Sequence, residues 1–194
     1  MIKLLVVGDG ERDGASVPPL IQTILQKPVE SEFERWPRLQ KRGLGRKLLF
    51  ATIQARTRKH DGLVAVVDAD QRMRSEKIKA LVAARTEMRQ SAPPFPTALG
   101  EAIPNGDAWL LDDPLAVFDA LQLDRNTPIA VVTKVRDPKP ELDAIIAMSS
   151  RADEDILQVL AAIAGLVRLE RCRHASDTGF EAFVKDVTAE LKPH

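Results

Sequence analysis

A short apolar run that ends in two acidic residues, at positions 63–70, most constrains the fold of this chain. Residues 63–67 are apolar and mostly branched at Cβ, and Asp68 and Asp70 follow them. Such a run is typical of a buried strand in a parallel sheet. In open α/β sheets, ligands bind beyond the carboxyl ends of the strands. We therefore expect an α/β fold with Asp68 and Asp70 at the functional edge of a central sheet.

The spacing of Asp68 and Asp70 allows two interpretations. Residues two apart on an extended chain project to the same side, and two neighbouring carboxylates repel each other unless a proton or a cation lies between them. This pattern favours a Mg²⁺ or Mn²⁺ site. The same two residues also suit a helix N-cap and a turn, because Asp is common in both positions. Both interpretations stay open from the spacing alone.

The first residues of the chain repeat the pattern. Residues 2–7 are apolar except for Lys3, and a glycine-rich turn at 8–14 follows, which contains Asp9 and Asp13. If the two strands are neighbours, Asp9, Asp13, Asp68 and Asp70 converge on one edge of the sheet. Their oxygen ligands suit Mg²⁺ or Mn²⁺ better than Zn²⁺. The turn lacks the Lys-Ser/Thr of a P-loop and the G-x-G-x-x-G spacing, so we do not expect it to bind a nucleotide directly.

The rest of the chain alternates between helical and strand-like patterns. We expect strands at 29–36 and 97–103, with a further strand-like stretch at 128–132. We expect helices at 16–26, 44–59, 73–89, 114–121, 140–148 and 153–166. The last helix, from Phe180 to Leu191, has an apolar stripe that predicts a docking face. Cys172 is expected to pack in the core.

A basic segment stands out at 35–59. It contains Arg38, Lys41, Arg42, Arg46 and Lys47, and it contains no acidic residue, although the 28 basic and 28 acidic residues of the whole chain cancel. A run of charge is commonly a solvated helix face. It also suits a surface that contacts the phosphates of a nucleic acid. Both interpretations stay open.

Composition excludes several classes of protein. The 194 residues are 44% hydrophobic, which is enough for a core and too much for a disordered chain. The single cysteine excludes an intramolecular disulfide and a cysteine zinc cluster, and the three histidines are far apart in the sequence. No apolar run is long enough to span a membrane, and no signal peptide is recognisable. We expect a cytoplasmic protein with no membrane partner.

The two acidic motifs, in this order, resemble the TOPRIM domain of topoisomerases, primases, small ribonucleases and OLD-family nucleases. The chain is most similar to small stand-alone TOPRIM proteins of the DUF4276 type, which are related to the OLD nucleases. Three further stretches carry that likeness, at 102–113, 137–139 and 172–183. The resemblance implies a Rossmann-like TOPRIM fold with a central, mostly parallel sheet flanked by helices. It implies an α/β core at 1–135 and a helical C-terminal extension at 136–194, packed on the core as one compact unit.

The same resemblance implies Mg²⁺- or Mn²⁺-dependent cleavage of phosphodiester bonds in DNA or RNA. The metal would be held by Asp68 and Asp70, with Asp9 and Asp107. Asp9, Asp13 and Lys139 would have catalytic roles, and Lys139 would offset the charge that develops on the phosphate. Asp9 stands where the family has Glu, and its side chain is one methylene shorter. The nearby Glu11 is a candidate to replace it. The residues that would bind the nucleic-acid backbone are Arg38, Lys41, Arg42, Arg46 and Lys47.

Two other functions remain open from the sequence. The chain suits a non-catalytic TOPRIM-like module that acts with a partner protein such as an ATPase. It also suits a phosphatase-like α/β domain in which Asp68 is the nucleophile and forms an aspartyl-phosphate.

Overall fold

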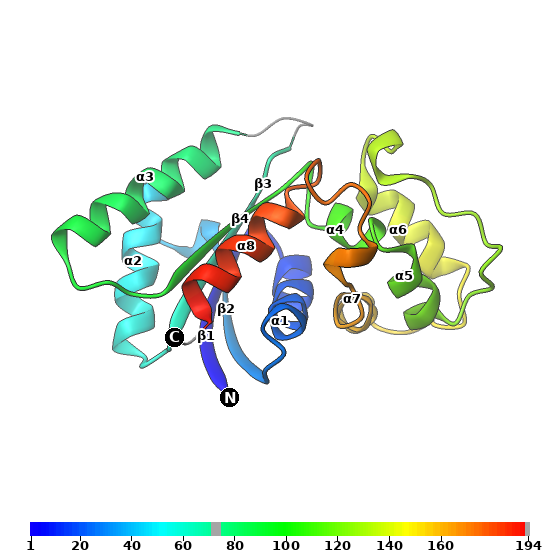
Figure 1. The fold of residues 1–194 in the computed structure, drawn as a ribbon, viewed down its shortest axis with the longest axis horizontal. Coiled ribbons are helices and arrows are strands. Elements are labelled where there is room, and N and C mark those ends of the chain that lie inside the picture. Colours follow the sequence, from blue (N-terminus) through cyan, green and yellow to red (C-terminus); the bar gives the residue numbers. More distant parts are fainter. Residues whose placement is uncertain (71–74, 193–194) are drawn as a thin grey trace.

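The computed structural model describes residues 1–70 and 75–192, and its framework is a four-stranded, all-parallel sheet (Figure 1). The strands lie in the order β2 (Val29–Arg35), β1 (Ile2–Gly8), β3 (Gly62–Asp68) and β4 (Thr97–Ala102). β1 and β3 are central and almost fully buried, and β2 is an exposed edge strand. The expected α/β class and the buried strand before Asp68 are confirmed.

Helices cover both faces of the sheet. Alternate residues of β1 point to opposite faces of the sheet. Leu4 and Val6 pack with α1 (Glu11–Leu25) and α8 (Phe180–Leu191). Leu5 and Val7 pack with α2 (Leu44–Thr57) and α3 (Glu76–Ser91). In Figure 1, α2 and α3 lie to the left of the sheet, α1 lies to its right, and α8 crosses in front of it. The arrangement is that of a Rossmann-like sandwich of helix, sheet and helix.

The remaining helices form a group beyond α1, on the right in Figure 1. They are α4 (Asp107–Leu111), α5 (Pro114–Leu121), α6 (Pro138–Ala147) and α7 (Ile156–Ala164). Short 3₁₀ turns lie at Trp36–Arg38, Val132–Lys134 and Leu169–Arg171. α7 packs against α1 and α5, and α6 packs against α4. The chain then returns to the sheet, where α8 packs on β4.

Aromatic packing explains why α8 docks on β4. The Phe183 ring stacks on Trp109, with ring centroids 4.7 Å apart, and Phe180 lies 5.6 Å from the same indole. A Cβ at Gly100 of β4 would lie 2.7 Å from the Phe183 ring, so only glycine allows this approach. The predicted docking face of the last helix is therefore buried. The division at residue 135 stays a prediction.

α1 begins five residues earlier than expected. The sequence analysis placed its start at Ser16, just before Pro18 and Pro19, whereas the helix starts at Glu11 and includes both prolines. Two contacts explain the early start. The Asp13 carboxylate accepts hydrogen bonds from backbone N–H groups before the helix, and Val17, Leu20 and Ile21 bury their side chains against the sheet. This burial outweighs the cost of the backbone N–H donors that Pro18 and Pro19 lack.

The expected strand at 128–132 is wrong. These residues are irregular and lead into the 3₁₀ turn at Val132–Lys134. Pro128 lacks an N–H donor, and only Val132 of this stretch is buried, so the alternation of a half-buried strand is missing.

Other boundaries agree more closely with the structure. α3 begins at Glu76 with Ser75 as its N-cap, and the expected start at 73 lies outside the described residues. Cys172 is half-buried and packs against the core on the α1 face, as expected. In the described part of the chain, none of the helices combines the length and the apolar character that crossing a membrane requires.

Candidate functional site

The candidate site is a cavity at the carboxyl edge of the sheet. Asp9 follows β1, Asp68 ends β3, and Asp107 begins α4 shortly after β4. The cavity has a volume of about 420 Å³. It is lined by Asp9, Gly10, Glu11, Arg12, Asp13, Ser16, Asp68, Asn105, Gly106, Asp107 and Lys139. Five of the predicted site residues therefore meet in one place, and Asp70 is not among them.

Three carboxylates tie the loops of this edge together. Asp13 Oδ2 accepts hydrogen bonds from the backbone nitrogens of Asp9, at 2.7 Å, and Gly10, at 3.0 Å. Asp9 Oδ2 accepts one from the nitrogen of Asp68 at 2.8 Å. Asp68 Oδ1 accepts one from the nitrogen of Gly106 at 3.1 Å. Within the described residues, each carboxylate thus uses one oxygen to hold the backbone and leaves the other without a described donor.

The clustering changes how these acids ionise. Burial, together with the charges of Asp13 and Asp9, raises the pKa of Asp68 to about 8. Burial also raises the pKa of Asp13 to about 6, although the backbone N–H groups of Gly10 and Asp9 oppose the change. Near neutral pH, Asp68 therefore keeps a proton. A cation beside it would replace that proton, because an opposite charge favours the ionised carboxylate.

Asp107 is held by Arg12, a residue that the sequence analysis did not select. Arg12 Nη2 lies 2.7 Å from Asp107 Oδ1, its Nε also donates to Asp107, and its Nη1 lies 2.9 Å from Asp143 Oδ1. Burial raises the pKa of Asp107 and outweighs the opposing effect of the Arg12 charge. This predicted metal ligand is therefore already in an ion pair that joins α1, α4 and α6.

Asp70 lies outside the cavity lining. β3 ends at Asp68, and Asp70 takes a left-handed conformation with φ of 60°, so the extended spacing assumed for the pair ends before Asp70. Its side chain is 68% exposed and forms an ion pair with Lys77 Nζ, which also donates to the carbonyl oxygen of Asp68 at 2.8 Å. The extended geometry from which a common direction of the Asp68 and Asp70 side chains was expected is therefore absent at Asp70.

Glu101 is a second residue that the sequence analysis missed. It is buried on β4, and its Oε1 accepts hydrogen bonds from the backbone nitrogen of Ser75, at 2.7 Å, and from the Ser75 hydroxyl, at 2.6 Å. Ser75 is the N-cap of α3. Glu101 therefore fixes the start of α3 beside the end of β3. The signal available in the sequence was a single charge inside an otherwise apolar strand.

Asn105 and Lys139 complete the cavity from the side of α6. Asn105 Nδ2 donates to Asp137 Oδ1 at 2.9 Å, which fixes the amide orientation because a carboxylate can only accept. Asn105 Oδ1 is then left buried without a hydrogen-bond partner among the described residues. Lys139 follows in the first turn of α6 and is exposed. An unpaired buried acceptor in this cavity is the kind of group that a cation or a donor on a ligand satisfies.

The residues predicted to bind nucleic acid follow β2, at the same carboxyl edge of the sheet. β2 runs parallel to β1 with Arg35 beside Gly8, so the segment after Arg35 starts next to Asp9. Arg38, Lys41, Arg42 and Arg46 are exposed, in and around the turn before α2. Lys47 instead has a structural contact, because its Nζ donates to the carbonyl oxygen of Trp36 at 2.6 Å.

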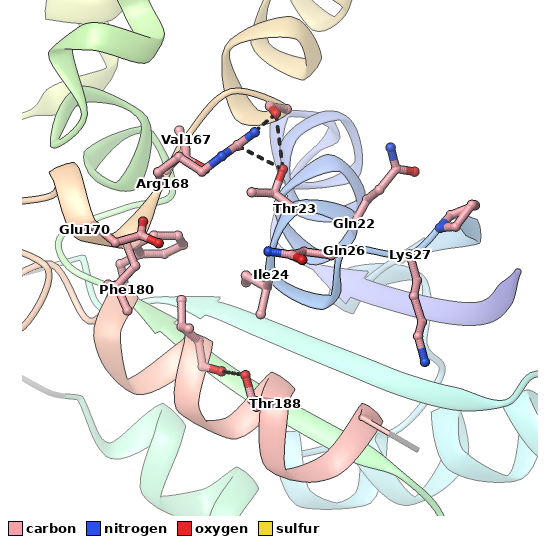
Figure 2. A pocket seen from close by; sticks show the side chains of 14 residues that line it. Gln22, Thr23, Ile24, Gln26, Lys27, Val167, Arg168, Glu170, Phe180 and Thr188 are labelled. Carbon is pink, nitrogen blue, oxygen red and sulfur yellow. Dashed lines mark hydrogen bonds between the residues drawn. The ribbon is translucent and has the colours of Figure 1, made fainter. Parts of the chain in front are cut away.

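A second and larger cavity, of about 600 Å³, lies between the end of α1, residues 165–170 and α8 (Figure 2). Arg168 lines this cavity, and its Nη1 donates to the carbonyl oxygens of Gly165, at 3.2 Å, and Val167, at 2.9 Å. Thr23 Oγ1 donates to the same Gly165 oxygen at 3.1 Å. These contacts cap the carboxyl end of α7, so Arg168 and Thr23 have a structural explanation.

The acidic cavity was tested for its fit to a divalent cation. Within residues 1–70 and 75–192, no group of three or more His, Cys, Asp or Glu side chains is arranged to hold a metal ion. A cage made only of protein ligands is therefore not present in the described part. Mg²⁺ does not need one, because it commonly binds through one or two carboxylates and keeps several waters. Asp9, Asp68 and the unpaired Asn105 oxygen fit that mode.

Comparisons of the chain with protein-family models, with curated proteins and with solved structures found no match. The functional assignment therefore depends on the chemistry of the site itself.

Proposed function

We propose that the chain cleaves phosphodiester bonds of nucleic acid with the help of Mg²⁺ or Mn²⁺, at the cavity that contains Asp9, Asp13 and Asp68. One observation carries the proposal. Three carboxylates, from the turn after β1, the first turn of α1 and the end of β3, meet in a cavity at the carboxyl edge of a parallel sheet, where ligands bind in such folds. The resemblance of the two acidic motifs to TOPRIM nucleases supports the same chemistry.

Asp9 and Asp68 are the residues that would hold the cation, with the Asn105 oxygen beside them. When bound, such a cation supplies Lewis-acid stabilisation of phosphate oxygens and lowers the pKa of its water. Asp13 is suited to accept a proton, because burial raises its pKa to about 6 and an efficient general base has a pKa near the working pH. Lys139 offers an exposed ammonium group at the same cavity for the charge on phosphate.

The basic residues supply a way to hold a nucleic-acid backbone next to this cavity. The exposed residues are Arg38, Lys41, Arg42 and Arg46. The segment that contains them begins beside Asp9. Contacts of Lys and Arg with phosphates position a nucleic acid without reading its sequence. We therefore expect binding that weakens steeply with salt, as the release of counterions requires.

Cleavage assays test the proposal. Purified protein is incubated with supercoiled plasmid, single-stranded DNA and RNA in Mg²⁺, Mn²⁺ or EDTA. We expect cleavage that needs the cation and that falls by about 100-fold or more in Asp68→Asn, a loss typical of a group that stabilises charge in the transition state. Asp153→Asn is the matched control, because Asp153 is exposed and lies far from the cavity lining. Cleavage that persists in EDTA, or equal rates in both variants, would contradict the proposal.

A second candidate is a module that acts through a partner protein. The observation that favours it is that two predicted metal ligands are already neutralised, Asp107 by Arg12 and Asp70 by Lys77. Under this alternative, the wild-type chain cleaves none of the three substrates in any metal, and it forms a stable complex with another protein, for example an ATPase.

A further inference from the structure

A groove on the helical layer that faces away from α1 and α8 has no role in the proposed chemistry. It has a volume of about 300 Å³ and lies between α2, α3 and the segment that links α3 to β4. Leu49 and Ile53 of α2 line one wall, and Met88 and Phe95 line the other. α2 and α3 approach each other closely at Gly45. A Cβ placed at this glycine would lie 3.2 Å from the Cβ of Ala84.

The apolar side chains of this groove are unusually exposed. Leu49 is 46% exposed and Ile53 is 52% exposed, one helical turn apart on α2. Scattered apolar residues are normal on a surface, but a group of large ones around a groove marks an interaction site.

Three arginines line the groove, and one of them has no carboxylate partner in the described part of the chain. Arg56, Arg85 and Arg89 line it, and no acidic side chain does. Arg85 and Arg89 are paired with Asp186 and Glu190 of α8. Arg56 has no carboxylate partner among the described residues. Its guanidinium donates to the carbonyl oxygen of Pro93 and lies 5.2 Å from the centre of the Phe95 ring, so the unpaired charge is held in a fixed place.

We propose that this groove binds an acidic amphipathic helix of another protein. The lining of α2 from Leu49 to Arg56 is about 10 Å long, which matches two turns of a bound helix. Such helices anchor apolar residues spaced by one turn in a groove, and a carboxylate on the helix flank would pair with Arg56. The proposal does not depend on the proposed nuclease activity.

Other occupants fit this groove less well. Aliphatic side chains such as Leu49 and Ile53 give a phosphate backbone nothing to pair with, so a nucleic acid would leave them exposed. A symmetric dimer through this face would offer the unpaired Arg56 no carboxylate partner, because no acidic side chain lines the groove of the second copy. An acidic helix satisfies both the apolar side chains of the groove and the unpaired Arg56.

The first test is selection of displayed random peptides of about 14 residues, or four helical turns. The full chain is the target, and the double variant Leu49→Ser/Ile53→Ser removes peptides that bind elsewhere. We expect the enriched peptides to carry apolar residues one turn apart, to be rich in Asp and Glu, and to lack Lys and Arg. Absence of enrichment, or enrichment of basic peptides, would overturn the proposal.

The second test measures the affinity of an enriched peptide by fluorescence anisotropy. Ile53→Ser is expected to weaken binding by about tenfold, since burial of such a side chain contributes about 1.5 kcal/mol or more. Arg56→Ala is expected to weaken binding and to reduce its dependence on salt. Leu115→Ser is the matched control, because Leu115 is 43% exposed on α5, away from the groove, and its change should leave the affinity unaltered.

Two further results would assign the groove to another occupant. A dimer seen by sedimentation in the wild type but not in Ile53→Ser would identify a second copy of the chain. Binding of duplex DNA that Leu49→Ser/Ile53→Ser abolishes would identify a nucleic acid. Either result overturns the proposal. Circular dichroism melting checks that the variants fold, which we expect because the replaced side chains are half exposed.

Discussion

Asp68 brings a carboxyl group into a half-buried position beside Asp9 and Asp13, and this has a measurable cost in stability. Burial raises the pKa of Asp68 to about 8 in the folded chain, against a usual value near 4 in an unfolded one. The folded state therefore binds a proton more tightly than the unfolded state. The stabilisation of the folded state that comes from this raised pKa of Asp68 is fully present below about pH 4. It is lost as the pH rises through about 8.

This predicts that the metal-free wild type loses melting temperature between about pH 5 and about pH 9, and that Asp68→Asn loses less. The amide cannot ionise, so it removes the repulsion with Asp9 and Asp13. Thermal melts in EDTA across this pH range measure the difference. Asp153→Asn should follow the wild-type curve. Parallel curves for wild type and Asp68→Asn would show that Asp68 is ionised at neutral pH without a cation.

A second prediction concerns proton release. If a cation binds beside Asp68, the carboxyl group must lose its proton, so each bound Mg²⁺ should release about one proton at neutral pH. The affinity should rise with pH up to about 8 for the same reason. Calorimetric titrations in buffers of different ionisation enthalpy measure the number of protons. Asp68→Asn should abolish the release, and binding without proton release would place the cation away from Asp68.

Single residues show how far the sequence could locate this site. Asp9, Asp13 and Asp68 could be placed together because the carboxyl ends of parallel strands share one edge. Arg12 could not be paired with Asp107, since 95 positions separate them in the chain. Asp70 could not be excluded, because a left-handed backbone at a non-glycine residue leaves no clear trace in the sequence. The free oxygen of Asn105 depends on its contact with Asp137, which only the fold creates.

At the level of elements, Arg12 joins three helices and should matter for stability. Its guanidinium pairs with Asp107 at the start of α4 and with Asp143 on α6, while Arg12 itself lies in the first turn of α1. Arg12→Met leaves the Asp107 carboxylate buried without its cation. Loss of one partner of a buried pair typically costs about 3–5 kcal/mol of unfolding free energy.

Urea unfolding measures this effect, and two further variants interpret it. Arg12→Met/Asp107→Asn should recover much of the lost stability, because a neutral amide is far less costly to bury than a lone charge. Arg125→Met breaks the exposed pair with Asp119 and should cost less than about 1 kcal/mol. If Arg12→Met costs no more than Arg125→Met, the bridge between α1, α4 and α6 contributes little.

The elements also show which local rules decided the fold. Central strands and long amphipathic helices could be predicted, because burial patterns of period two and 3.6 survive in the sequence. The start of α1 could not, since two prolines at 18 and 19 indicate a helix start by local rules. Here the burial of Val17, Leu20 and Ile21 decided instead. The stretch at 128–132 has strand-like residues, but only Val132 is buried in the core and Ile129 packs against it partly buried.

On the scale of the whole molecule, the two faces of the sheet should unfold together. Trp36 lies in the core on the α2–α3 face, and its Nε1 donates to the carbonyl oxygen of Val66 at 2.7 Å. Trp109 lies in the core on the opposite face, against Phe183 of α8. Both cores share the strands β1, β3 and β4, so neither face can lose its packing while the sheet stays intact.

Two variants with a single tryptophan test this cooperativity. Trp109→Phe leaves Trp36 as the fluorescent probe, and Trp36→Phe leaves Trp109. In urea, each fluorescence transition should coincide with the loss of helical circular dichroism measured on the same variant, as expected for a single cooperative unit. If Trp109 instead responds at lower urea than the circular dichroism, α8 and the helices beyond α1 unfold separately. That result would indicate that the C-terminal part is an extension docked on an independently stable core. It would contradict a single compact unit that needs α8 to cover β4.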